Sequence, residues 1–219
     1  MLDNTDKTVS AAVGLTVFTF LINVKLDSII IVYLNAIVIL GMFGYSIWRL
    51  DALKILRHSL IIGAIAAVTY LPIDNLFGSL KSLGLITYLK HDLLLGITPL
   101  HIFLNWICLM TIVLYFYQRL RSLFDKVYLP MLLTGVVASG GSIILTILGN
   151  YSGLWLWNTT GFAPPPFLGS LPLFVPIGLF LTFLFSPYFV INILAGGIRC
   201  GVTLGLMQFL CFVAFRYFQ

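Results

Sequence analysis

Long apolar stretches separated by short polar segments run through the whole chain. Most of these stretches reach about the 20 residues that an α-helix needs to cross the hydrocarbon core of a bilayer. The pattern predicts seven transmembrane helices, at roughly 9–24, 28–48, 58–78, 97–118, 127–148, 168–187 and 190–217. The short alternating segments of a membrane β-barrel are absent from the sequence. The predicted fold is therefore that of an all-α integral membrane protein.

The composition agrees with a single transmembrane domain covering residues 1–219. Hydrophobic residues make up 60% of the chain and charged residues 9%, against about 25% charged residues in a soluble domain. The basic residues lie in separate short loops, so the net charge of +5 does not indicate binding to nucleic acid. Because loops 48–57 and 119–126 carry several of them, the positive-inside rule places these loops and the N-terminus in the cytoplasm.

A similar phrase occurs twice, each time after an odd-numbered predicted helix. Residues 84–106 read GLITYLKHDLLLGITPLHIFLNW, and residues 153–180 read GLWLWNTTGFAPPPFLGSLPLFVPIGLF. Each copy runs from Gly-Leu through aromatic and polar residues to Gly, Pro-Leu and an apolar span. Either helices three–four and five–six form an internal repeat, or two apolar segments are alike by chance. Both loops are expected on the same side of the membrane.

Two aspartates stand out, because a carboxylate near hydrocarbon is costly and marks a functional site by default. The other five aspartates are assigned to termini or short loops: Asp3, Asp6, Asp27, Asp51 and Asp125. Asp74 ends the third predicted helix, one turn after Tyr70 on the same face. Burial disfavours an ionised carboxylate, so Asp74 is a candidate proton donor; the alternative is an interfacial loop cap. Asp92, beside His91, either caps the next helix or takes part in chemistry.

Other polar side chains lie inside the predicted spans. His101 and Asn105, four residues apart, form either a hydrogen-bonded pair or part of a ligand-lining face. Arg199 in the last helix either pairs with Asp74 or Asp92, or extends to a lipid headgroup.

Aromatic residues crowd the two loops that carry the phrase. They belong either to the aromatic belt at the membrane surface or to a pocket in which ring quadrupoles stabilise a cation. The candidates for such a pocket, with one neighbouring amide, are Tyr88, Trp106, Trp155, Trp157 and Asn158.

Three glycines in the last helix, Gly197, Gly201 and Gly205, recur every four residues and therefore share one face. This spacing permits close helix packing, either within the chain or in a homodimer. No cofactor or metal site is predicted. The sequence lacks paired DDxxD carboxylates, zinc-spaced His and Cys residues, and a Gly-rich phosphate loop.

Residues 70–77, Tyr-Leu-Pro-Ile-Asp-Asn-Leu-Phe, resemble the Pro-x-Glu-Glu-x-x-Phe segment of membrane lycopene cyclases, with Asp74 and Asn75 in place of two carboxylates. The repeated phrase resembles the carotenoid hydratase pattern, in which an acidic residue precedes Gly, aromatics, Leu-Gly and a Val-Pro-Leu-led span. Seven-helix meroterpenoid cyclases are similar in size and carry a lone acid in their third helix.

This resemblance implies a metal-free, acid-initiated cyclisation or hydration of an isoprenoid lipid, a terpenoid or a carotenoid. Asp74 would protonate an alkene or epoxide, and aromatic side chains would shield the carbocation. Asp92, His91 or His101 would act as the base that ends the reaction. The alternative function is that of a non-enzymatic transporter or assembly partner for a lipid or small hydrophobic molecule, since transporters often contain internal repeats.

Overall fold

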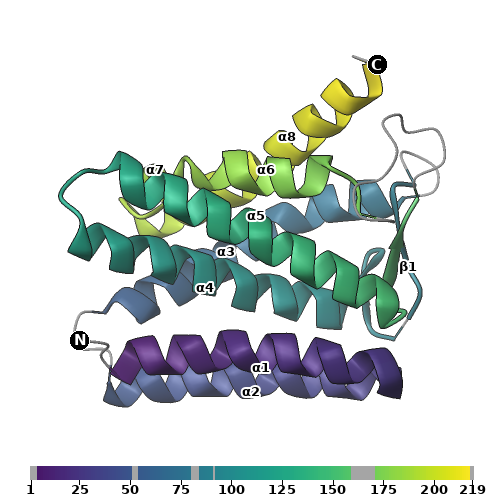
Figure 1. The fold of residues 1–219 in the computed structure, drawn as a ribbon, viewed down its shortest axis with the longest axis horizontal. Coiled ribbons are helices and arrows are strands. Elements are labelled where there is room, and N and C mark those ends of the chain that lie inside the picture. Colours follow the sequence, from purple (N-terminus) through teal and green to yellow (C-terminus); the bar gives the residue numbers. More distant parts are fainter. Residues whose placement is uncertain (1–3, 51–53, 80–83, 91, 159–170, 218–219) are drawn as a thin grey trace.

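The computed structural model describes residues 4–50, 54–79, 84–90, 92–158 and 171–217. The chain forms a bundle of helices running side by side, with short strands at one end (Figure 1). The long helices are α1 (Asn4–Leu26), α2 (Ile29–Arg49), α3 (Ile55–Gly78), α4 (Leu100–Leu123), α5 (Tyr128–Tyr151) and α8 (Ile193–Tyr217). Within the described residues, these six are long and apolar enough to cross a membrane. The predicted class, an all-α multi-pass membrane protein, is confirmed.

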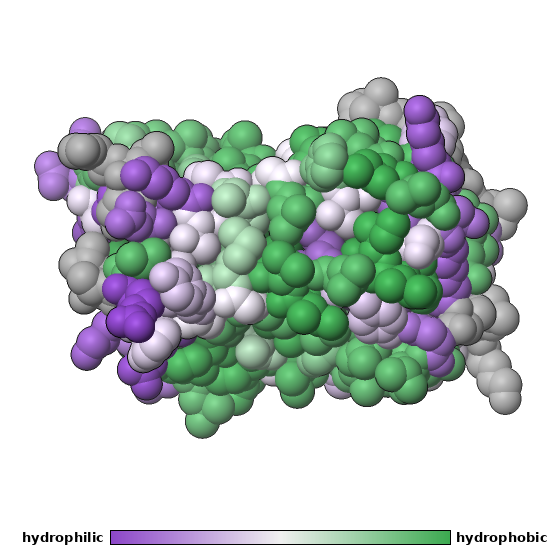
Figure 2. All heavy atoms as spheres, turned by 90° about the horizontal axis from the view of Figure 1, so that it is seen from below, coloured by the Kyte–Doolittle hydropathy of each residue, from purple (hydrophilic) through white to green (hydrophobic). Residues whose placement is uncertain are grey.

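The outer surface carries the side chains expected against lipid. Figure 2 shows hydrophobic residues across the middle of one face and hydrophilic residues gathered toward its two ends. Large apolar side chains such as Phe18, Ile30 and Leu34 are more than half exposed. A soluble protein seldom exposes contiguous apolar surface on this scale, whereas hydrocarbon solvates it well.

The predicted helix 168–187 is not one long helix in the described residues. It corresponds to α6 (Phe174–Phe183) and the single turn α7 (Ser186–Phe189), separated by Leu184 and Phe185. The ten residues of α6 extend about 15 Å, half of the roughly 30 Å hydrocarbon core. Residues 168–170 lie outside the described part of the chain. Six spans are therefore described, and the seventh stays a prediction, as does the orientation of the N-terminus.

The assignment of Asp6 to an exposed terminus is wrong. Helix α1 begins at Asn4, five residues earlier than predicted, and Asp6 lies buried within its first turn. The Tyr115 hydroxyl donates to Asp6 Oδ1 at 2.8 Å, and the Arg119 guanidinium donates to Oδ2 at 2.8 and 3.1 Å. Because α4 also extends to Leu123, it carries both partners and holds the start of α1 against itself.

Gly197, Gly201 and Gly205 form a glycine ridge on α8. This ridge packs against another helix of the same chain, which is the first of the two arrangements predicted for it. A Cβ added at Gly201 would lie 2.5 Å from the carbonyl oxygen of Ala66, and one at Gly197 or Gly205 would overlap Ile65 or Ile73. All of these neighbours belong to α3. The ridge is therefore covered by α3 within the chain, and a homodimer stays a prediction.

The two copies of the repeated phrase lie side by side at one end of the bundle. Strands β1 (Ile86–Tyr88) and β4 (Trp155–Trp157) pair antiparallel, with Thr87 opposite Leu156. Each strand follows a glycine with positive φ, 57° at Gly84 and 60° at Gly153, and then a buried leucine. The two loops share one end of the bundle, as predicted. We call this strand pair the aromatic ribbon, since it carries Tyr88, Trp155 and Trp157.

A short hairpin follows β1 in the chain and precedes α4. Its strands are β2 (Leu94–Leu95) and β3 (Thr98–Pro99), joined through Gly96. Thr98 therefore lies on β3, directly before α4 begins at Leu100.

Candidate functional site

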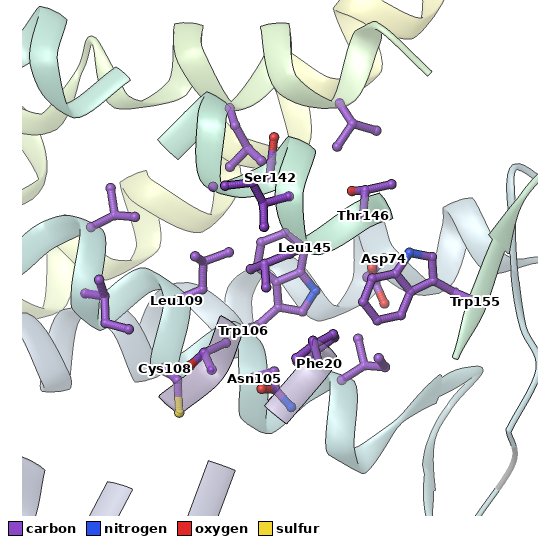
Figure 3. A pocket seen from close by; sticks show the side chains of 18 of the residues that line it. Phe20, Asp74, Asn105, Trp106, Cys108, Leu109, Ser142, Leu145, Thr146 and Trp155 are labelled. Carbon is purple, nitrogen blue, oxygen red and sulfur yellow. The ribbon is translucent and has the colours of Figure 1, made fainter. Parts of the chain in front are cut away.

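A cavity of about 240 Å³ lies inside the bundle (Figure 3). Residues of α1, α3, α4 and α5 form most of its wall, and the aromatic ribbon covers one end. Most of the lining is apolar, and the polar side chains include Thr16, Tyr70, Asp74, Tyr88, Asn105, Ser142, Thr146 and Gln208. An apolar pocket with a few convergent polar groups is the usual form of a small-molecule site.

Asp74 is the carboxylate in the wall of this cavity. It lies near the end of α3, two residues after Pro72, and is 4% exposed. The Tyr88 hydroxyl donates to Asp74 Oδ2 at 2.6 Å, and the Thr98 hydroxyl donates to the same oxygen at 2.5 Å. Among the described residues, no donor reaches Oδ1. One carboxyl oxygen of Asp74, Oδ2, is therefore held by two hydroxyls.

Tyr88 reaches Asp74 from the aromatic ribbon, outside the membrane-spanning helices. Its burial, and next the neighbouring Asp74 carboxyl, raise the pKa of the Tyr88 hydroxyl well above its ordinary value of 10. Tyr88 therefore keeps its proton at physiological pH and serves Asp74 as a hydrogen-bond donor.

Asn75 holds the hairpin that supplies Thr98. Its Oδ1 accepts hydrogen bonds from the backbone N–H groups of Ile97 at 2.5 Å and Thr98 at 3.0 Å, and its Nδ2 donates to the carbonyl of Leu95 at 3.1 Å. Gly96 has φ +76°, and a Cβ there would lie 2.7 Å from Asn75 Oδ1. The Asn75 amide therefore positions Thr98, which is one of the two hydrogen-bond donors to Asp74.

Tyr70 and Trp106 form a second part of the wall. The Tyr70 hydroxyl donates to Gln208 Oε1 at 2.7 Å, which ties α3 to α8. The rings of Tyr70 and Trp106 meet edge to face with centroids 4.9 Å apart. Asn105, the residue before Trp106 on α4, also lines the cavity. Its Nδ2 donates to the carbonyl of His101 at 2.7 Å.

Trp155 and Trp157 close the ribbon end of the cavity. Trp155 packs on Phe20 of α1 with ring centroids 6.1 Å apart, and Trp157 packs edge to face on Phe174 at 5.5 Å. Gly149 makes room for Trp155, because a Cβ there would lie 2.1 Å from the indole ring. In the view of Figure 3, Trp155 and Asp74 both lie toward this end of the cavity.

The structure thus brings together seven of the predicted site residues and separates others. Those that line the cavity are Tyr70, Asp74, Tyr88, Asn105, Trp106, Trp155 and Trp157. Asn158 and Arg199 do not line it, and both are exposed. Arg199 forms no ion pair with Asp74 or Asp92 in the described structure, and its contact with a lipid headgroup stays a prediction. His91 lies outside the described residues.

His101 and Asp92 form a separate pair. His101 Nδ1 lies 3.5 Å from Asp92 Oδ1, and the imidazole is fully buried with its edge toward Tyr33 of α2, ring centroids 5.6 Å apart. Neither residue lines the cavity. Their role as a terminating base stays a prediction.

Sequence reasoning missed Thr98 and Gln208 as site residues. Gln208 did carry a signal, since it is an amide inside the apolar helix α8. Thr98 carried none, because its contact with Asp74 depends on how the hairpin folds back over α3. Among the described residues, no group of three or more His, Cys, Asp or Glu side chains could hold a metal ion.

Comparison with known proteins identifies no relative of this chain. No family model matches the chain, and no curated protein or solved structure matches it significantly.

Proposed function

We propose that this chain is an integral membrane enzyme that cyclises or hydrates an isoprenoid lipid, with Asp74 as the proton donor. The observation that carries the proposal is a single arrangement: a buried carboxyl group on the wall of an apolar, aromatic-rich cavity, with one oxygen held by two hydroxyls. Ionised carboxylates are costly at such a place, which favours the acid form that a proton donor needs.

The proposed reaction begins when the carboxylic acid of Asp74 gives its proton to an alkene carbon or an epoxide oxygen of the bound lipid. Asp74 becomes a carboxylate. In an alkene the π electrons form the new C–H bond and leave a carbocation, and in an epoxide a ring C–O bond breaks to leave a hydroxyl and a carbocation. The Tyr88 and Thr98 hydroxyls stabilise the new negative charge through their hydrogen bonds to Oδ2. The π-faces of Trp106, Trp155 and Tyr70 stabilise the positive charge.

The reaction ends in one of two balanced ways. In a cyclisation, a second alkene of the lipid forms a carbon–carbon bond to the cation, and a neighbouring carbon then loses a proton. In a hydration, water forms the new carbon–oxygen bond and loses a proton. In both cases the Asp74 carboxylate takes up a proton again, so the enzyme returns to its starting state and no oxidant or reductant is consumed.

The experiment is expression in hosts that produce terpenoids or carotenoids, followed by lipid extraction and mass spectrometry. Wild-type protein is expected to give a new lipid, Asp74→Asn none, and Asp27→Asn the wild-type profile, because Asp27 is an exposed aspartate that does not line the cavity. If wild type and Asp74→Asn give identical profiles in all such hosts, the enzyme proposal fails. The alternative of a transporter or assembly partner would then be tested by flux of an isoprenoid across vesicles.

A further inference from the structure

The cavity meets the outer surface of the bundle at one seam. Most of the residues that line it are buried or half-buried. In the part of the chain that the structure describes, three lining residues are also exposed: Val13 on α1 at 42%, and Val137 and Ile144 on α5 at 43% and 48%. A residue that both lines a cavity and is exposed marks where the cavity opens. The opening therefore lies between α1 and α5, and we call it the window.

Gly141 lies in the window. It lines the cavity, and a Cβ added there would meet no atom within 4 Å. The next side chain, Ser142, turns back to its own helix and donates to the carbonyl of Ser139 at 2.7 Å. Gly141 thus leaves the gap between α1 and α5 open, and any larger side chain at this position would partly fill it.

Hydrogen bonds hold α1 in place toward both of its ends, on either side of the window. At one end, Asp6 binds Arg119 and Tyr115 of α4. At the other end, the Ser152 hydroxyl donates to the carbonyl of Phe20 at 3.2 Å. Val13 lies between these fastenings, near the middle of an apolar helix that is long enough to span a membrane.

We propose that the hydrocarbon chain of a membrane lipid enters the cavity sideways through this window, directly from the bilayer. The window lies near the middle of two spanning helices and is framed by valine, isoleucine and glycine, so it faces hydrocarbon rather than water. Asp74 and the aromatic ribbon lie toward one end of the cavity, where the reactive end of the lipid would come to rest. The inference rests on the proposed function only in treating the cavity as a ligand site.

The window is tested by quenching of tryptophan fluorescence in nanodiscs. Three of the four tryptophans, Trp106, Trp155 and Trp157, line the cavity, and the exposed Trp48 is removed by Trp48→Phe in every sample. The quencher is a phospholipid brominated at the middle of one acyl chain. Gly141→Leu is compared with Gly140→Leu, because a Cβ at Gly140 also meets no atom within 4 Å but Gly140 does not line the cavity.

Gly141→Leu is expected to lower the quenched fraction at least about twofold, because a leucine side chain closes a gap that only a thin chain can pass. Gly140→Leu is expected to match the wild type. Equal quenching in all three proteins, or equal protection in both variants, would overturn the proposal. The quencher is a phospholipid and not an isoprenoid, so this test does not depend on the proposed reaction. If Gly141→Leu lowers the quenched fraction but the protein makes no new isoprenoid product, the proposed function is refuted and the window stands.

Discussion

The paired hydroxyls on Asp74 allow a quantitative prediction. Tyr88 and Thr98 donate to the same oxygen, Oδ2, and all three residues are buried. Tyr88→Phe or Thr98→Val alone leaves Oδ2 with one donor, so each should lower the free energy of unfolding by about 1 kcal/mol, the net value of a typical hydrogen bond.

The double variant leaves a buried acceptor without either hydroxyl, at a further cost of about 1–3 kcal/mol for an unsatisfied buried group. The two changes together should therefore cost about 3–5 kcal/mol, against about 2 kcal/mol for the sum of the single variants. The expected coupling is about 1–3 kcal/mol, with the double variant less stable than additivity predicts.

The assay is chemical unfolding in lipid–detergent bicelles, followed by tryptophan fluorescence for the wild type, both single variants and the double variant. Thr98→Ser is the matched control, because it keeps the hydroxyl and removes one methyl group. Coupling smaller than about 0.3 kcal/mol, the scatter of independent sites, would refute the view that Tyr88 and Thr98 share one oxygen of Asp74.

Two further predictions concern the packing around the site and use the same unfolding assay. Gly201→Ala should destabilise the protein by about 1–3 kcal/mol, because its Cβ would lie 2.5 Å from a backbone oxygen of α3, whereas Gly44→Ala, which meets no atom within 4 Å, should be neutral or stabilising. A Gly201→Ala variant as stable as Gly44→Ala would contradict the close α3–α8 contact. Arg119→Gln should cost at least about 2 kcal/mol, because it removes the cation from the buried Asp6, whereas Lys90→Gln, whose partner Asp27 is 70% exposed, should cost less than about 1 kcal/mol. Equal effects of these two variants would count against a buried Asp6 pair.

Much of the fold follows from hydrophobic pattern alone, because a bilayer allows few backbone arrangements. Apolar length predicts α2, α3 and α5 to within a few residues, since each backbone group must find its partner within the helix. The same pattern fails where a polar residue is paired in space. Asp6 looks like part of a solvated terminus until Arg119, 113 residues away, is placed beside it.

The site was predictable in part for a related reason. Asp74 and Tyr70 share a helical face, so helical spacing alone brings both to the cavity. The repeated phrase indicated that the two aromatic loops lie on the same side, but not that they pair as strands β1 and β4. The contact between Thr98 and Asp74 depends on a loop that Asn75 shapes, and loop geometry of this kind leaves no periodic signal in a sequence.

The central claim, that Asp74 starts a reaction by protonating an isoprenoid, is tested most directly with deuterium. Membranes from a host in which the protein makes a new lipid are incubated with the lipid precursors in D₂O, and the product is analysed by mass spectrometry. Because the Asp74 proton exchanges with solvent between turnovers, protonation at an alkene carbon predicts a product with one non-exchangeable deuterium, formed by the wild type and absent with Asp74→Asn. An epoxide-initiated reaction places the deuterium on a hydroxyl oxygen, so the assay uses precursors without an epoxide. A product that forms from an alkene without solvent deuterium, or that forms equally with Asp74→Asn, would contradict the account.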